Sequence, residues 1–249
     1  MREGAAAAGG PADGGNRPGP DAGPVWGRPR RGTRGPAPER SRGQITAAAI
    51  ALADAGGLDA VSMRQVAGAL GTGPASLYRY IASRDDLIDL MADEIAAEID
   101  LESPVAQDPI TALVDLAVQV KAVYLRHPWL LDVMAQRTPL GPRAVDYMEH
   151  VLRILEPVQA PIQAKLETVG VLTGLVNLFA RTEVNLRREG ATYDQQRAGQ
   201  AAYLATAAAD GNHPQLLAAF TAAASAPTAE PDGALFERVM RKLLNALVN

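Results

Sequence analysis

The residues that could do chemistry gather in one short segment, residues 62–81, which reads SMRQVAGALGTGPASLYRYI. Its pattern predicts two short helices joined by a glycine turn, an arrangement that enters the major groove of DNA in many proteins. On the second helix, Leu77 and Ile81 are needed inside, so the small residues at the start of that helix face outward. Small residues let the backbone approach base edges closely. We expect three of them to meet the bases: Pro74, Ala75 and Ser76.

Basic and aromatic side chains surround this start. Arg64, on the first of the two helices, carries a guanidinium that matches the O6/N7 edge of guanine. Others are placed for phosphates, which position a protein on DNA without specifying sequence: Tyr78, Arg79, Tyr80 and Arg84. Arg42, at the start of the preceding helix, is a further expected DNA contact. An ordinary helical hairpin with solvated arginines and tyrosines would show the same pattern.

The elements that position these residues are all expected to be helices. Alanine and leucine are plentiful and aromatic residues make up 4% of the chain, a mixture that favours helices over strands. Ser62 with Gln65 and Ser83 with Asp86 are spaced as helix-capping pairs. Glycine and proline breaks predict a helix from Ser83 to about 100, followed by helices near 108–126, 128–135, 142–156, 161–188, 193–210, 213–224 and 234–248.

Residues 1–40 differ from the rest because they are rich in glycine, proline and arginine and hold few large apolar residues. Such a segment buries too little surface to offset the entropy of ordering, so we expect it to be disordered. Its arginines suit a basic arm along the DNA backbone, and a solvated tail without a role fits equally well. The chain has a net charge of −4, but its acids concentrate in residues 83–100, behind a mildly basic hairpin.

Composition also excludes several kinds of chemistry. The chain has no cysteine, which rules out disulfides and thiolate sites. We find no signal-peptide core and no apolar run long enough to span a membrane, so we expect a soluble, cytoplasmic and nucleoid-associated protein. His127, His150 and His213 lack metal-ligand spacing, and His127 is expected to be an exposed residue at a helix boundary. We expect no metal, no cofactor and no enzymatic activity.

Residues 44–91 resemble the N-terminal domain of the tetracycline-repressor (TetR) family of bacterial transcription regulators. The resemblance covers the Gly-Leu-x-Ala-Val-Ser joint, Arg-Gln-Val-Ala…Leu-Gly, Leu-Tyr-Arg-Tyr-Ile and Ser-Arg-Asp-Asp-Leu. It implies base contacts from Arg64 and from the small residues above, and phosphate contacts from Tyr78, Arg79 and Tyr80. Tyr80 stands where many relatives have histidine, and Arg84 replaces a lysine that often holds a phosphate. The long N-terminal extension also departs from the family.

The resemblance continues more weakly into residues 168–188 and 234–247, which look like the two helices that form a dimeric four-helix interface in the family. A buried core helix would have the same pattern. The apolar residues that the resemblance assigns to this interface are Val169, Leu172, Val176, Phe179, Leu235, Val239, Leu243 and Leu247.

Members of the family usually carry a small-molecule pocket in the C-terminal domain, and the resemblance implies one here. Bulky apolar residues could line such a cavity, although plain core packing explains each of them as well. The candidates are Trp129, Met134, Tyr147, Met148 and Phe179.

Together these features predict an all-α protein with a disordered arm over residues 1–40, a three-helix helix-turn-helix DNA-binding domain over 41–88, and a helical-bundle domain for ligand binding and dimerisation over 89–249. The expected function is that of a ligand-responsive transcriptional repressor. It would bind a palindromic double-stranded DNA operator as a homodimer, be released by a small apolar molecule, and have no membrane partner. The alternative is an all-α small-molecule-binding or protein-interaction protein that does not read DNA.

Overall fold

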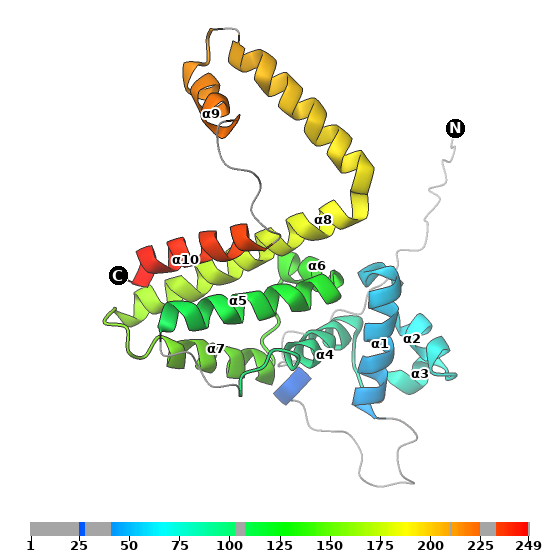
Figure 1. Cartoon of the computed structure of the whole chain (residues 1–249). Coiled ribbons are helices and arrows are strands. Elements are labelled where there is room, and N and C mark those ends of the chain that lie inside the picture. The colour runs from blue at the N-terminus through cyan, green and yellow to red at the C-terminus, as the bar shows by residue number, and fades with distance from the viewer. Residues whose placement is uncertain (1–24, 28–40, 103–107, 210, 225–232, 249) are drawn as a thin grey trace, which may run out of the picture.

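A computed structural model describes residues 25–27, 41–102, 108–209, 211–224 and 233–248, and within these ranges every regular element is a helix (Figure 1). The all-α prediction is therefore confirmed. A 3₁₀ turn, η1 (Val25–Gly27), comes first. It is followed by α1 (Arg42–Gly56), η2 (Leu58–Ala60), α2 (Met63–Ala69), α3 (Pro74–Leu77), α4 (Arg84–Ala96), α5 (Pro109–Arg126), α6 (Trp129–Gln136), α7 (Pro142–Ile154), α8 (Ile162–Ala209), α9 (Pro214–Ala224) and α10 (Ala234–Val248).

Helices α1 to α3 form a small head whose boundaries follow local sequence signals. The side chain of Ser41 accepts a hydrogen bond from the backbone N–H of Gln44, and the Gln44 side chain accepts one from the N–H of Ser41, so α1 begins with a complete capping box. Gly57, with a φ of 75°, ends α1, and the Ser62 side chain caps α2. Gly71, with a φ of 64°, allows the tight turn before Pro74 opens α3.

The inner face of the head agrees with the sequence prediction. Val66, Leu77 and Ile81 are all at most 1% exposed and belong to one core with the inner face of α1. This burial fixes which side of α3 faces outward, because the apolar side chains must point toward α1.

Helix α4 joins the head to a larger helical body (Figure 1). Leu87 and Met91 are fully buried, and α4 packs on both α1 and α7. The predicted helix over residues 83–100 is therefore observed but ends at Ala96. Asp89 lies near Arg137, and Asp93 accepts a hydrogen bond from the backbone N–H of Arg143. These two acids of α4 thus face the body.

The body is built from α5, α7, α8 and α10, with α6 at the end nearest the head (Figure 1). Gly190 has a non-helical conformation, with φ 44° and ψ −123°, so the predicted break between residues 188 and 193 is observed as a kink within α8. Beyond this kink, α8 projects away from the bundle, and α9 folds back against α8 (Figure 1). No helix in the described ranges is both long and apolar enough to cross a membrane.

One part of the prediction for residues 1–40 is wrong. Val25 is 3% exposed, and η1 packs against α4. A Cβ atom on Gly141 would come within 2.8 Å of the Trp26 ring, so only glycine leaves room for this indole. Two apolar residues are enough to hold a short turn against the body. The other residues of the predicted arm, including its arginines, lie outside the described residues.

Arg84 has a different role from the predicted one. Its Nε donates to the carbonyl of Val61 at 2.7 Å and its Nη2 to the carbonyl of Leu58 at 2.9 Å. The guanidinium therefore points into the joint between α1 and α2, where it is the side-chain donor to the Val61 carbonyl and a second donor to the Leu58 carbonyl, which also accepts the backbone N–H of Val61. We correct its assignment as a phosphate contact to that of a residue that stabilises the head.

Replacing Arg84 by alanine should lower the free energy of unfolding by about 1–3 kcal/mol, because the part-buried Val61 carbonyl loses its side-chain donor and the Leu58 carbonyl loses one of two donors. Urea unfolding followed by circular dichroism measures this change. Arg79→Ala is the matched control, since Arg79 is exposed and its loss should change stability by less than about 0.5 kcal/mol. Equal stabilities for the two variants would contradict the structural role of Arg84.

Candidate nucleic-acid interface and ligand pocket

The outer surface of the head carries most of the residues expected to contact DNA. Arg64, Pro74, Ala75 and Arg79 are exposed, and Tyr78 is 52% exposed. Ser76 and Tyr80 are half-buried, and Tyr80 also packs against the core. The small residues at the start of α3 thus leave its backbone open to an approaching surface, with tyrosine and arginine directly after them.

Arg42 links the two ends of this surface. Its Nε donates to the carbonyl of Tyr80 at 2.9 Å, which ties the first turn of α1 to the segment after α3. Arginine has five N–H donors, so this single bond leaves donors for an anion. Arg42 therefore combines a structural contact with its expected position at the DNA-facing surface.

The five residues predicted for a ligand pocket do not converge on one cavity. Trp129 is 1% exposed, and its indole N–H donates to Asp54 of α1 at 2.7 Å, so it packs at the junction with the head. Phe179 meets Phe236 of α10 edge to face, with ring centroids 5.2 Å apart. Met134 packs against the core, and Met148 is 36% exposed on α7. Among these candidates, only Tyr147 belongs to the polar cluster described next.

A polar cluster lies inside the body between α5, α7 and α8. Tyr124 of α5 is 5% exposed and shares a side-chain hydrogen bond with Asn177 of α8. Burial raises the pKa of Tyr124. Burial also raises the pKa of Tyr147, and the nearby phenol of Tyr124 raises it further. His150, one turn after Tyr147 on α7, is 5% exposed, and its Nδ1 has no hydrogen-bond partner.

The electrostatics of this cluster favour neutral groups. Burial and the neighbouring Arg153 lower the pKa of His150, although Asp100 and Glu102 act in the opposite direction. Both phenols stay protonated at neutral pH because burial disfavours their charged form. An unpaired polar atom in a buried site normally has a partner in some state of the protein. Sequence reasoning did not assign Tyr124 or His150 to a ligand site. For Tyr124 a signal was available, because this tyrosine lies on the apolar, buried face of α5.

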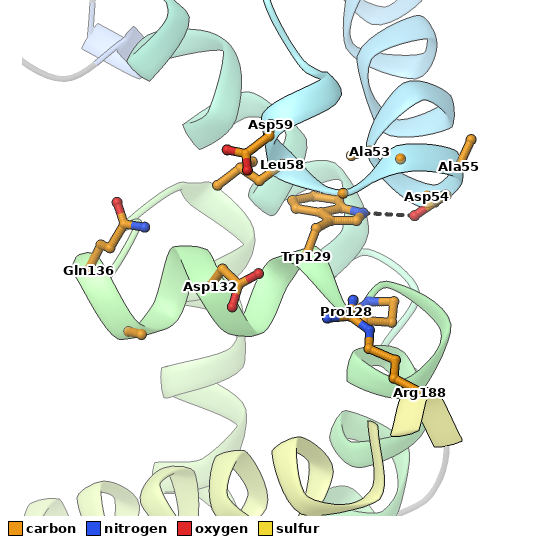
Figure 2. A pocket seen from close by; sticks show the side chains of 13 residues that line it. Ala53, Asp54, Ala55, Leu58, Asp59, Pro128, Trp129, Asp132, Gln136 and Arg188 are labelled. Atoms are coloured by element: carbon orange, nitrogen blue, oxygen red, sulfur yellow. Dashed lines mark hydrogen bonds between the residues drawn. The ribbon is translucent and has the colours of Figure 1, made fainter. Parts of the chain in front are cut away.

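A groove of about 650 Å³ lies at the junction of head and body (Figure 2). The end of α1, the following loop to Asp59, and α6 form its walls, and Arg188 of α8 lies at one side. Trp129 points from α6 toward Asp54 along this groove (Figure 2). Of the residues predicted for the ligand pocket, Trp129 lines this groove, whereas Met134, Tyr147, Met148 and Phe179 do not.

The apolar residues predicted for a dimer interface divide into two groups. On α8, Val169, Leu172 and Val176 are at most 6% exposed and pack in the core of the same subunit, and Phe179 is half-buried there. Their assignment to an interface between subunits does not agree with this burial. On α10, Leu235, Leu243 and Leu247 are 36–49% exposed, and Val239 is half-buried in the same row.

Another row of α8 is exposed in place of the predicted one. Leu166 is 44% exposed and Leu178 is 60% exposed, and Gly170 and Gly174 lie between them at helical spacing. A Cβ on either glycine would meet no atom within 4 Å. The outer side of α8 is therefore apolar and closely approachable, and α10 packs beside it.

The part of the chain that the structure describes contains no group of three or more His, Asp or Glu side chains able to hold a metal ion. Its notable arrangements are the outward-facing head, the neutral polar cluster in the body, and the apolar outer rows of α8 and α10.

Comparison of the chain with known proteins identifies its family. Residues 45–91 match the family model described as bacterial regulatory proteins, tetR family, and residues 105–248 match the one described as tetracyclin repressor-like, C-terminal domain. The HTH-type transcriptional repressor DrrR1 of Streptomyces coeruleorubidus is 33% identical over 228 residues, which cover 90% of this chain and 83% of DrrR1.

Solved structures agree with this result. The TetR family protein ActR of Streptomyces coelicolor in complex with actinorhodin has a TM-score of 0.70 and 26% identity, over 84% of this chain and 96% of ActR. ActR in complex with (S)-DNPA has a TM-score of 0.68 and 25% identity, over 84% and 97% of the two chains. The chain is thus a DNA-binding transcriptional regulator and belongs to the tetR family of bacterial regulatory proteins.

Proposed function

We propose that this protein is a homodimeric repressor that binds a palindromic operator in the bacterial cytoplasm, at the nucleoid, and leaves it when a small molecule enters the body. The exposed surface of the head carries this proposal, because its apolar side is buried while Arg64, Arg79 and the start of α3 face outward. In a dimer, two such heads would enter successive major grooves about one helical turn apart. The repressor DrrR1 supports the assigned direction of regulation.

We infer specific roles within the head. Arg64 and the small residues at 74–76 read base edges, and Arg42, Tyr78, Arg79 and Tyr80 hold phosphates. A base contact from arginine discriminates between sequences, whereas a phosphate contact strengthens binding to all of them. The two arginines therefore have separable signatures.

Arg64→Ala should weaken operator binding by about 1–3 kcal/mol and relax the sequence preference at one position of each half-site. Arg79→Ala should weaken specific and non-specific binding alike and reduce the salt slope by about one per contact. Fluorescence anisotropy, with an operator selected from a random library on the unaltered protein, measures both effects.

Arg153→Ala is the control, because Arg153 is exposed in the last turn of α7, outside the helices α1 to α3 that form the head. Binding that survives both head substitutions unchanged would contradict the contact assignments. An unaltered protein that selects no sequence would favour the alternative of a binding or interaction protein that does not read DNA.

We further propose that the dimer forms through the outer rows of α8 and α10, with Leu166, Leu178, Leu235 and Leu243 at its centre. Apolar residues in rows along packed helices form an exposed patch of the kind that marks an interface. The glycines of α8 would let the two subunits approach closely.

Leu178→Asp should convert the dimer to monomers at micromolar concentration. Each copy loses about 2 kcal/mol of apolar burial, so the dissociation constant should rise at least about a hundredfold. Sedimentation velocity measures this change. Leu140→Asp is the matched control, since Leu140 is 67% exposed but precedes α7, away from the proposed interface. A fully dimeric Leu178→Asp variant would reject this face.

The effector site is proposed at the polar cluster of Tyr124, Tyr147 and His150. Its neutral donors and acceptors within an apolar bundle suit an uncharged, hydroxylated aromatic compound. The complex of ActR with actinorhodin supports binding of a small molecule within this fold.

A thermal-shift panel of neutral hydroxylated aromatics, including actinorhodin, tests this site. A bound compound at a hundred times its Kd should add about 2.7 kcal/mol of stability. Tyr147→Phe should reduce the shift of the best compound while leaving the unliganded melting temperature nearly unchanged. Tyr203→Phe is the control, because Tyr203 is 73% exposed on the projecting part of α8. An unaltered shift in Tyr147→Phe would move the site elsewhere.

A further inference from the structure

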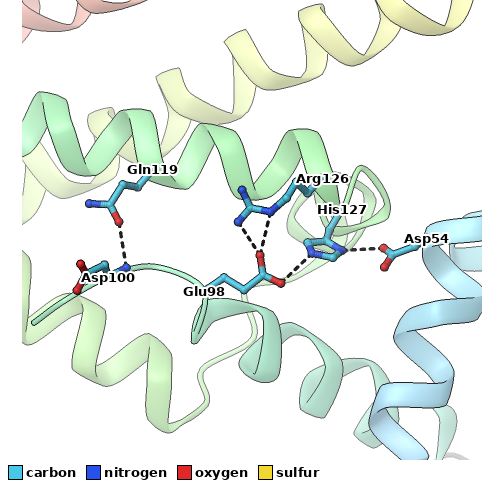
Figure 3. Close-up of polar contacts among 6 residues, drawn as sticks. All are labelled: Asp54, Glu98, Asp100, Gln119, Arg126 and His127. Carbon is cyan, nitrogen blue, oxygen red and sulfur yellow. Dashed lines mark hydrogen bonds and ion pairs between the residues drawn. The ribbon is translucent and has the colours of Figure 1, made fainter.

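His127 lies between two carboxylates from different parts of the molecule (Figure 3). Its Nδ1 is 2.7 Å from Oδ1 of Asp54, on the last turn of α1 in the head. Its Nε2 is 3.0 Å from Oε1 of Glu98, just after α4. His127 is 9% exposed, so sequence reasoning was wrong to expect an exposed boundary residue.

The ring is held firmly on the body side. His127 caps the end of α5, where its backbone N–H donates to the carbonyl of Val123 at 2.9 Å. Arg126 reaches the other oxygen of Glu98 with Nε at 3.0 Å and Nη2 at 2.6 Å. Burial alone would raise the pKa of Glu98, but the hydrogen bonds from Arg126 and His127 outweigh it and lower that pKa.

Asp54 receives a second donor from the same corner of the body. The Trp129 indole N–H lies 2.7 Å from the same Oδ1 that His127 approaches. A carboxylate in the last turn of a helix is unfavourable, because the helix dipole is negative there. The two donors offset that cost, and they can do so only while the head stays against the α5–α6 corner.

The corner is in turn fixed to α8. Arg181 donates to the carbonyl of Leu131 at 2.6 Å and pairs with Asp132 at 3.2 Å, both on α6. A continuous series of contacts thus runs from α8, through α6 and the corner, to Asp54 on α1. Because α8 carries the proposed dimer face, these contacts connect each head to that face.

The groove beside Asp54 leaves this side of the junction without close packing (Figure 2). Apolar contacts hold α1 on α4, but toward α6 the wall includes Asp54, Asp59 and Asp132 around open space. The hydrogen bonds of Asp54 fix the angle between the head and the body, but they do not fill the groove beside them. Loss of these bonds would therefore leave the head free to tilt toward the groove.

We propose that Asp54, His127 and Trp129 form a latch that positions the DNA-binding head, so that the two heads of a dimer match one spacing of operator half-sites. The two ring nitrogens of His127 face the two carboxylates, Nδ1 that of Asp54 and Nε2 that of Glu98. His127 is thus a positioning residue, which acts on DNA recognition through Asp54 without touching DNA. This inference rests on the proposed binding of an operator by a dimer, and it explains why the dimer would prefer one spacing of the half-sites.

The first test compares full-length Asp54→Asn and His127→Gln with the unaltered protein on the selected operator and on versions whose half-sites are moved by one or two base pairs. The unaltered dimer should lose at least about tenfold in affinity on the shifted operators, equivalent to about 1.4 kcal/mol. The latch variants should lose less than about threefold, because their heads adjust. Asp59→Asn is the matched control, since Asp59 lines the same groove without belonging to the latch.

The second test measures the heads directly. The chain has no cysteine, so Ala82→Cys places a single spin label on each exposed head of the dimer. The distance distribution between the two labels should be narrow in the unaltered background and in Asp59→Asn. It should broaden in Asp54→Asn and His127→Gln.

Latch variants that keep both the spacing preference and the narrow distribution would overturn the latch, even if they melt at a lower temperature. Asp54 is exposed and Asp54→Asn keeps its shape, so this variant stays informative if His127→Gln folds poorly. An unaltered protein that binds DNA with no spacing preference, or as a monomer, would instead overturn the proposed dimeric operator binding, and the latch with it.

Discussion

The DNA-binding head depends on the buried face of α4. Residues 41–82 alone form a very small core, and small units bury too little of their surface to be stable by themselves. Leu87 and Met91 of α4 complete that core from below, while the other side of the same helix packs on α7. The head therefore cannot separate from the body without losing its own core, but it can tilt as α4 tilts. Recognition of DNA is consequently coupled to any rearrangement among the helices of the body.

The head was predictable from sequence because its signals are local. Ser62, Gly71 and Pro74 mark helix ends within a few residues of where they act, and the apolar spacing of Leu77 and Ile81 fixes the inner face of α3. Arg84 was misassigned because a residue type shows which bonds a side chain can make, and not the direction in which it points. Its two carbonyl partners lie more than twenty residues earlier, where no local pattern reveals them. The prediction that His127 is exposed was wrong for the same reason, since its partners Asp54 and Glu98 are distant in sequence.

The body was harder to predict because α8 and α10 are apolar on two sides. On α10, the row of Phe236, Met240 and Leu244 is buried, and the row one residue earlier, which begins at Leu235, is also apolar but exposed. Periodicity detects both rows and cannot decide which one faces the subunit's own core. A helix that is apolar on more than one face is typical of a structure buried on both sides. The second apolar row in the sequence and the exposed apolar row in the structure therefore point to the same conclusion, that these helices are covered on both sides.

The strength of the latch explains why it suits a regulator. Asp54 and Glu98 keep about a third of their side chains exposed, so each hydrogen bond contributes on the order of 1 kcal/mol after competition with water. Allosteric coupling free energies are typically about 1–3 kcal/mol, the range that a few such bonds supply together. An apolar junction of the same area would hold the head too firmly for one small molecule to move it. A junction with no specific bonds would leave the two heads without a defined spacing, so a few part-exposed polar contacts meet both requirements.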